Sequence, residues 1–213
     1  AVGDDVLGQE LVKEVKKQKI NSKFIQKVRN SHTNLSVVLA PKDERTILAY
    51  RGSSKEVSFE KIPKKEIVQT KWFYLAPLNN FDFLRKAVSL GRKNKVKIFI
   101  NPNRQVLIEK NEAFKKILKN VDVLLLNQRE FFLLINKQKF TSDCLLFSVR
   151  DFFKGILVVT NGANEIKVLD GQNNLSTVFP PRIQVIDRTG AGDAFGSGFL
   201  GGLIKFQKVD KAL

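Results

Sequence analysis

From residue 72 onward, short apolar runs alternate with amphipathic segments of helical spacing, and this alternation restricts the fold more than any other feature of the chain. The runs 121–126 and 155–159 are apolar almost throughout, which is typical of strands covered on both faces. The pattern predicts an α/β fold with a mostly parallel central sheet flanked by helices. The expected strands are 72–76, 96–100, 121–126, 155–159, 165–169, 175–179 and 182–186, and the expected helices are 81–93, 111–119, 128–136, 141–153 and 190–206.

Ahead of this region lie a helix candidate at 6–19 and a pair of β-rich runs. Residues 34–40 and 45–51 are separated by the polar stretch 41–44, and this arrangement predicts a β-hairpin. The chain has 213 residues, of which 43% are hydrophobic, so it is long enough to bury a sizeable core. We therefore expect residues 1–213 to form a single α/β domain.

The string DRTGAGD at 187–193 carries the strongest chemical signal, because it follows the expected strand 182–186 and opens an expected helix. Ligands of parallel α/β sheets bind at the carboxyl ends of the strands. Gly190 and Gly192 let the backbone approach an anion closely, and a helix start offers unpaired N–H groups. A carboxylate at Asp193 can then take a proton from a substrate hydroxyl while the amides hold a phosphoryl group. The alternative is that Asp193 only caps the helix or places a negative charge at its N-terminus.

A second polar pair, Asn127 and Glu130, follows the expected strand 121–126. An amide and a carboxylate one helical turn apart share a face of the helix. Both can reach Mg²⁺ and its waters, which Mg²⁺ releases reluctantly. The alternative is a helix cap, with Asn127 as the N-cap and Glu130 as its capping-box partner. Taken alone, Asn127 and Glu130 are better explained as a helix cap. Their position directly after a strand and ahead of residues 187–193 instead favours a metal site.

These strings resemble the motifs of the ribokinase-like sugar kinases, the phosphofructokinase-B group. Residues 187–193 match the family's Asp-x-x-Gly-Ala-Gly-Asp signature, 127–130 match its Asn-x-x-Glu motif, and 160–162 match its Thr-x-Gly turn. The resemblance implies an enzyme that transfers the γ-phosphoryl group of ATP to a hydroxyl of a sugar or nucleoside. It also implies that Asp193 is the catalytic base.

The resemblance assigns a role to each matched residue. The implied anion hole consists of Gly190, Ala191 and Gly192. The residues implied to contact ATP are Asn127, Glu130, Thr160, Gly162 and Gly192. The implied metal ligands are Glu130 for Mg²⁺ and Asp187 with Thr189 for K⁺. Glu165 stands where the family usually has a second glycine, so the turn at 160–165 departs from the pattern, and a plain hairpin turn is the alternative. Residues 101–104 resemble a segment in which Arg104 meets a phosphate or a substrate carboxylate, and a surface arginine is an equally open alternative.

The front of the chain resembles the family as well. Residues 33–38 and 46–52 resemble the strand pair of its lid, so we expect residues 33–60 to form part of a β lid that excludes water during transfer. The lid often makes dimer contacts in relatives, which leaves a homodimer as an open alternative. The Gly-Asp-Asp turn at 3–5 is expected to be structural. Nothing matches the family's Gly-Gly-x-x-x-Asn segment, so we expect an internal piece of a longer kinase, truncated at both ends.

Charge and composition bear on partners and location. The net charge is +16, but the lysines are scattered without interleaved aromatic residues, so we interpret the charge as solvated surface and expect no nucleic-acid partner. No apolar run reaches the roughly 18–20 residues of a membrane span. Cys144 is the only cysteine, which indicates a reducing cytoplasm. The alternative function is a non-catalytic nucleotide-sensing or partner-binding module on the same fold, although such a module needs no base at Asp193.

Overall fold

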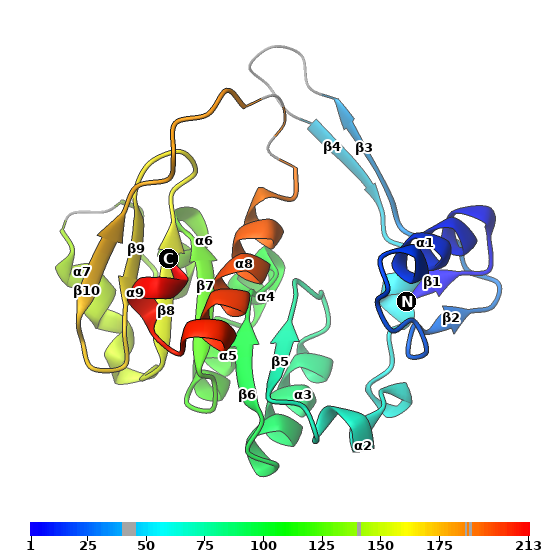
Figure 1. The fold of residues 1–213 in the computed structure, drawn as a ribbon, viewed down its shortest axis with the longest axis horizontal. Helices are drawn as coiled ribbons and strands as arrows, with labels where there is room; N and C mark the ends of the chain where they lie inside the picture. Colours follow the sequence, from blue (N-terminus) through cyan, green and yellow to red (C-terminus); the bar gives the residue numbers. More distant parts are fainter. Residues whose placement is uncertain (40–45, 140–141, 186, 188) are drawn as a thin grey trace. The chain divides into compact units, whose positions relative to one another are not determined.

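The computed structural model describes residues 1–39, 46–139, 142–185, 187 and 189–213, and its largest element is a six-stranded sheet (Figure 1). The strand order is β10-β9-β8-β7-β6-β5. Strands β5 to β8 pair in parallel, and β9 and β10 continue the sheet antiparallel, which confirms the expected mostly parallel sheet. The strands are β5 Trp72–Leu75, β6 Lys97–Ile100, β7 Val123–Asn127, β8 Ile156–Thr160, β9 Ile166–Leu169 and β10 Leu175–Val178.

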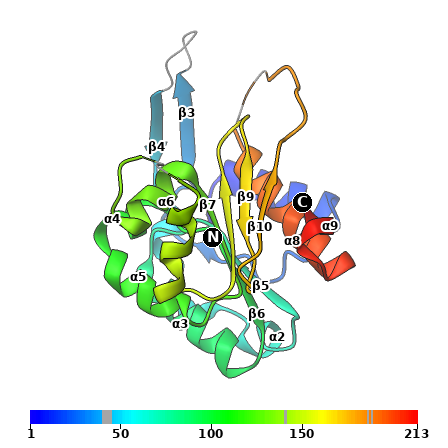
Figure 2. The same cartoon turned by 90° about the vertical axis from the view of Figure 1, so that its left-hand side faces the viewer.

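Helices cover both faces of this sheet, with α3 to α6 on one face and α8 and α9 on the other (Figure 2). Successive side chains of a strand point to opposite faces, so a strand buried on both sides must be apolar at every position. Leu125 of β7 packs with Phe99 and Val158 against Phe199 of α8. The helices are α3 Phe81–Lys93, α4 Arg104–Glu109, α5 Asn111–Leu118, α6 Gln128–Ile135, α7 Cys144–Phe147, η3 Ser148–Asp151, α8 Ala191–Phe206 and α9 Val209–Ala212.

Asparagine side chains begin several of these helices shortly after a strand ends. The Asn80 side chain accepts a hydrogen bond from the Phe83 N–H at 2.9 Å, and the Asn103 side chain accepts one from the Gln105 N–H at 2.8 Å. Such a cap satisfies an N–H group that would otherwise lack an intrahelical partner. The caps therefore fix where the chain turns from strand to helix, at the edge of the sheet where a ligand can bind.

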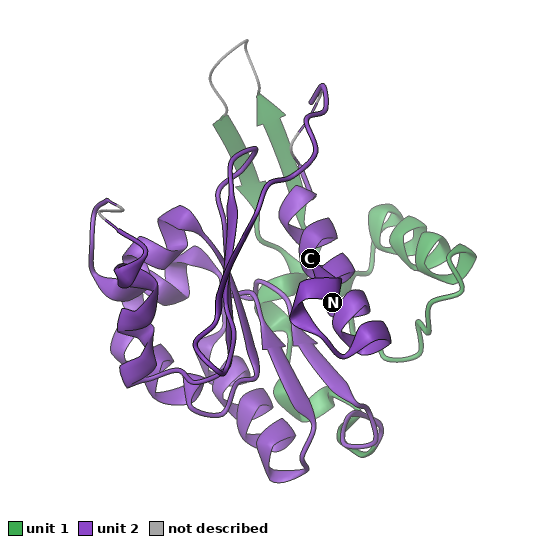
Figure 3. Cartoon of the chain, turned by 60° about the vertical axis from the view of Figure 1, so that its left-hand side comes forward, with its two compact units in different colours: residues 1–65 green, residues 66–213 purple. Residues whose placement is uncertain are grey.

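The chain divides into two compact units, Ala1–Lys65 and Glu66–Leu213, and the sheet and its helices belong to the second (Figure 3). The first unit pairs β1 with β2 in parallel and β3 with β4 antiparallel. The expected lid segment, 33–60, lies wholly in the first unit, and the single domain expected over 1–213 stays a prediction. The elements of this part are β1 Val2–Gly3, α1 Val6–Lys17, β2 Lys27–Val28, β3 Leu35–Leu39, β4 Thr46–Tyr50, η1 Ser53–Glu56 and η2 Phe59–Lys61. The helix α2, Lys64–Ile67, spans the boundary between the two units.

The two strands of the predicted hairpin are confirmed, and its joining stretch 41–44 lies outside the described residues. The Gly-Asp-Asp turn is structural, as expected. The Asp5 carboxylate accepts hydrogen bonds from the Gly8 N–H at 2.8 Å, from the Thr33 N–H at 2.7 Å and from the Thr33 hydroxyl at 2.6 Å. These bonds lower the pKa of the Asp5 carboxyl to about 2. Asp5 thereby caps α1 and ties it to the chain ahead of β3.

Two expected elements are wrong. Residues 182–185 form no strand, and Ile186 lies outside the described residues. The apolar Ile183 is 73% exposed, and the run follows two prolines, which cannot donate to a sheet ladder. The helix expected at 141–153 is a single short α7 followed by the tighter η3, while Thr141 lies outside the described residues. No helix in the described part of the chain is long and apolar enough to cross a bilayer.

Candidate active site

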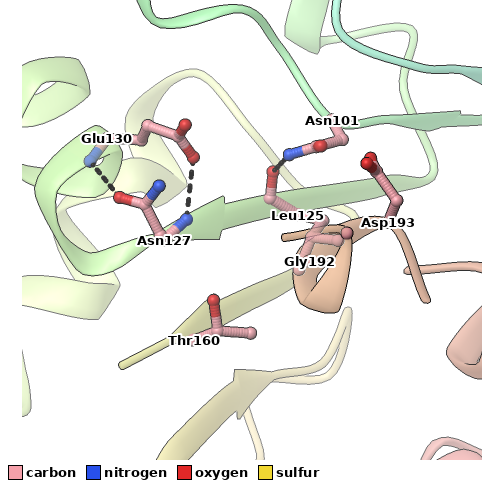
Figure 4. Close-up of a pocket in the computed structure, with 8 residues that line it drawn as sticks. Asn101, Leu125, Asn127, Glu130, Thr160, Gly192 and Asp193 are labelled. Carbon is pink, nitrogen blue, oxygen red and sulfur yellow. Dashed lines mark hydrogen bonds between the residues drawn. The ribbon is translucent and has the colours of Figure 1, made fainter. Parts of the chain in front are cut away.

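A cavity of about 210 Å³ opens in the second unit where the carboxyl ends of the parallel strands meet the start of α8 (Figure 4). Asn101 directly follows β6, while Asn127 and Thr160 are the last residues of β7 and β8. This is where ligands of parallel α/β sheets bind. The lining residues are Asn101, Leu125, Asn127, Glu130, Thr160, Gly190, Gly192 and Asp193.

The start of α8 has the backbone shape that its glycines predicted. Gly190 is the N-cap residue and has φ +79°, in the left-handed region that favours glycine. The Gly190 carbonyl accepts the first helical hydrogen bond, from the Ala194 N–H at 2.8 Å. A Cβ built on Gly190 or on Gly192 would meet no atom within 4 Å, so the space above this turn is open. The first N–H groups of a helix lack intrahelical partners, and together with the helix dipole they favour an anion here.

Asp193 lies in the first turn of α8, is exposed and lines the cavity. A carboxylate at this position can accept a proton from a hydroxyl bound in the cavity. The neighbouring backbone amides can at the same time hold a negatively charged group. Asp193 is not the cap of α8, because the N-cap is Gly190 and no side chain makes the capping bond. Asp193 therefore does not cap α8, whereas the other alternative, a negative charge in the first turn of the helix, fits its position.

Asn127 and Glu130 form a complete capping box at the start of α6 and also line the cavity. The Asn127 side chain accepts a hydrogen bond from the Glu130 N–H at 2.9 Å, and Glu130 Oε2 accepts one from the Asn127 N–H at 2.8 Å. Burial raises the pKa of the Glu130 carboxyl, while its bonds with Asn127 and the charge of Arg104 oppose the rise. The cap and a ligand site are thus compatible, since both residues line the cavity while they form the capping box.

The Thr-x-Gly turn is only partly in the cavity. Thr160 lines it, whereas Gly162 does not and instead takes φ +60° in the turn that joins β8 to β9. The Asn164 N–H donates to the Asn161 carbonyl at 3.0 Å, and β8 and β9 pair antiparallel. The turn therefore has the shape of a hairpin, and a contact between Gly162 and nucleotide stays a prediction.

Asp187 and Thr189 lie just ahead of α8 and bind each other. The Thr189 N–H and hydroxyl donate to Asp187 Oδ1 at 2.9 Å and 2.8 Å. Neither residue lines the cavity, and Arg188 between them lies outside the described residues. Their role as ligands of a monovalent cation stays a prediction.

Asn101 and Leu125 line the cavity although sequence reasoning gave neither a role in the site, and Asn101 is the polar one. Its side-chain amide donates to the Leu125 carbonyl at 3.0 Å, which joins the end of β6 to β7 (Figure 4). The available signal was its position, the first polar residue after a buried strand, because such positions gather at one edge of a parallel sheet.

The fold and the cavity first define a class: an α/β protein with a mostly parallel sheet and a glycine-rich helix start at the ends of its strands. The sequence model of the pfkB family carbohydrate kinases matches residues 1–213. The chain therefore belongs to the pfkB family of carbohydrate kinases.

Individual relatives are distant and agree with this assignment. An ATP-dependent 6-phosphofructokinase of Thermoanaerobacterium thermosaccharolyticum is 26% identical, over all of this chain and 68% of the relative. A ribokinase of Haemophilus influenzae is 24% identical, over all of this chain and 69% of the relative. The solved adenosine kinase of Sinorhizobium meliloti superimposes with a TM-score of 0.87 at 22% identity, over 99% of this chain and 66% of its own. The chain thus spans about two thirds of each of these proteins.

Proposed function

We propose that this chain carries the catalytic centre of an ATP-dependent kinase that transfers the γ-phosphoryl group to a hydroxyl of a sugar or nucleoside, with Asp193 as general base. One observation carries the proposal. One cavity is lined by groups from separate segments: the glycine turn of α8 with the Asp193 carboxylate, the Asn127–Glu130 pair, and Thr160. A base beside an anion-binding turn is the arrangement that phosphoryl transfer to an alcohol requires.

The chemistry follows from these positions. The acceptor hydroxyl gives its proton to the Asp193 carboxylate as its oxygen forms a bond to the γ-phosphorus of ATP. The bond from that phosphorus to the β,γ-bridging oxygen breaks, and ADP leaves with the bond's electron pair. The N–H groups of the turn at Gly190, Ala191 and Gly192 stabilise the charge on the oxygens being transferred. The same turn holds those oxygens in line with the acceptor, which removes much of the entropic barrier.

Mg²⁺ fits the donor set of the cavity, and when bound it would neutralise charge on the ATP phosphates. Glu130 is a partly desolvated carboxyl, and a cation beside it would favour its charged form. Asn127 adds an amide to the same wall of the cavity. No group of three His, Cys, Asp or Glu side chains in the described ranges can hold a metal by itself. The ion would therefore rest mainly on phosphate oxygens and water, with Glu130 and Asn127 beyond them.

The proposal extends to the remaining expectations. Thr160 and Gly162 would contact nucleotide phosphates, and Asp187 with Thr189 would bind K⁺ ahead of the glycine turn. The acceptor class rests on relatives whose names are those of phosphofructokinase, ribokinase, cytidine kinase and adenosine kinase. These names include kinases of sugars and of nucleosides, so the proposed acceptor is a sugar or a nucleoside without a narrower assignment. We further propose a cytoplasmic enzyme whose positive charge is a solvated surface without a nucleic-acid partner.

The lid expected at 33–60 would exclude water and would also be the contact of a homodimer. All residues of β3 and β4 are exposed, and most of them are apolar or aromatic. An apolar ribbon of this kind usually marks a surface covered by protein. The exposed large side chains of this ribbon are Leu35, Val37, Val38, Leu39, Ile47, Leu48 and Tyr50.

The test of the function is acceptor-dependent release of ADP by the protein and by its Asp193→Asn variant. Asparagine keeps the size of the side chain and cannot act as a base, so kcat should fall at least about 100-fold with unchanged circular dichroism. Activity of the variant within a few-fold of the parent would remove Asp193 from its proposed role.

A further inference from the structure

Tyr74 on β5 is a buried polar group that the proposed chemistry does not use. Its ring packs edge-on against Phe99, with 4.8 Å between the ring centroids. Its hydroxyl oxygen is buried and makes no hydrogen bond to any described residue. Burial without a partner removes the hydroxyl from water at a net cost, so such groups are uncommon and need an explanation. A phenylalanine would fill the same space without that cost.

The hydroxyl lies directly beneath the first turns of α8. A Cβ built on Gly196 would come within 2.8 Å of Tyr74 Oη, so the oxygen faces the helix where a side chain is missing. Asp193 precedes Gly196 by three positions, which places both on the same face of the helix. Helix Cβ atoms lean toward the N-terminus, so the space left by Gly196 lies on the side of Asp193.

Electrostatics agrees with this placement. Burial raises the pKa of the Tyr74 phenol, and the negative charge of Asp193 raises it further. The phenol is therefore held in its neutral form, which is the form that donates a hydrogen bond. Glu130, from α6 on the far side of β7, is the other titratable side chain that lines the cavity with Asp193.

We propose that Tyr74 positions the base. Its hydroxyl donates a hydrogen bond to one water, and that water donates to the Asp193 carboxylate, which turns the other carboxylate oxygen toward the acceptor hydroxyl. This inference rests on the proposed function, since it assigns Tyr74 a part in the same proton transfer. Tyr74 acts through Asp193, touches neither substrate nor nucleotide, and is a positioning residue.

The first test is the pH profile of kcat for Tyr74→Phe, which removes only the hydroxyl oxygen. A carboxylate that loses a hydrogen-bond donor binds its proton more tightly, so the acidic limb of the profile should move to higher pH. At the plateau kcat should fall by about 3- to 10-fold, with the KM for ATP unchanged. The matched control is Trp72→Phe, two positions along the same strand and packed against the same core. It should lower thermal stability and leave the acidic limb in place.

A second test does not depend on activity. The chain has two tyrosines, Tyr50 and Tyr74, so the difference in phenolate absorbance between parent and Tyr74→Phe isolates the titration of Tyr74. In the Asp193→Asn background that titration should shift to lower pH, because the charge that opposes the phenolate is gone. An unshifted titration would overturn the proposed proximity.

The two proposals fail separately. An acidic limb that superimposes on that of the parent in folded Tyr74→Phe protein would overturn the role of Tyr74, even if Asp193→Asn is inactive. An active Asp193→Asn enzyme would overturn the proposed function itself.

Discussion

Gly190, Gly192 and Gly198 all lie near or in α8 with open space above them, yet alanine at each should have a different effect. A Cβ at any of the three would meet no atom within 4 Å, so steric overlap contributes nothing. Gly190 alone among them has a positive φ, +79°. Alanine in the left-handed region costs roughly 1–2 kcal/mol, so Gly190→Ala should lose that much unfolding free energy.

The measurement is thermal unfolding together with steady-state kinetics. For a chain of this size, 1–2 kcal/mol corresponds to a fall in Tm of about 2–8 °C for Gly190→Ala. Gly198→Ala lies inside the helix and away from the cavity, so it should gain about 0.5–1 kcal/mol and keep its activity. Gly192→Ala lines the cavity, so its methyl group should displace the phosphoryl group and lower kcat/KM about tenfold or more, with Tm within about 2 °C.

Two results would refute this reasoning. If Gly190→Ala is as stable as the parent, the left-handed turn is not required at the start of α8. If Gly192→Ala keeps full activity, the transferred group does not lie against this turn, and the anion hole must be elsewhere.

Further predictions separate structural from chemical roles. Asn127→Ser keeps a good N-cap but loses the amide, so it should keep Tm and weaken activation by Mg²⁺. Asn127→Ala should weaken activation as well and also lose about 1 kcal/mol of unfolding free energy. Full activation of both variants by Mg²⁺ would show that Asn127 only caps. The pKa of Asp5 is lowered from 3.8 to about 2, so its contribution to stability is present above pH 3.8 and is lost as the pH falls toward 2. When Tm is measured as a function of pH in acid, Asp5→Asn should therefore lose Tm less steeply than the parent. Parallel plots of Tm against pH for the two proteins would contradict this. Gly196→Ala would place a Cβ 2.8 Å from Tyr74 Oη, so it should lower the free energy of unfolding, measured in urea, by about 1–3 kcal/mol. The loss should be smaller in the Tyr74→Phe background, where the hydroxyl is absent. An equal loss in both backgrounds would mean that the hydroxyl is not the obstacle.

Periodicity predicted most of the sheet and its long helices to within a residue or two. The helix expected at 81–93 has the same bounds in the structure, because its apolar face and its Asn80 cap agree. Runs such as 121–126 are apolar enough that a buried strand was the natural interpretation. The segment 182–186 shows the limit of this reasoning. Alternation makes a strand possible, but a strand also needs a neighbour with free backbone groups, which sequence alone does not supply.

The short elements were missed for a different reason. The parallel pair β1 and β2 joins residues 25 positions apart, such as Val2 and Lys27, and each strand is too short to show a period. The helix α4 is also short, and its start depends on the Asn103 cap more than on an apolar stripe. Local propensity is weak over such lengths, and tertiary contacts decide them.

The site was predictable where spacing and strand ends coincide. Asp193, Asn127 and Thr160 each follow a strand or open a helix, so their convergence could be expected. Spacing did not reveal that Asn127 and Glu130 serve as cap and cavity wall together, because both roles need the same separation. It also did not reveal Tyr74, since an aromatic residue within a strand looks like core until the helix above it is placed.

The most direct test of the central claim is transfer of a γ-phosphoryl label from ATP to each member of a panel of sugars and nucleosides, with Mg²⁺ present. We expect labelled phosphate ester from at least one acceptor with the parent and none above background with Asp193→Asn. Tight Mg²⁺-ATP binding without transfer to any acceptor would contradict the account and favour a non-catalytic nucleotide-binding module on this fold.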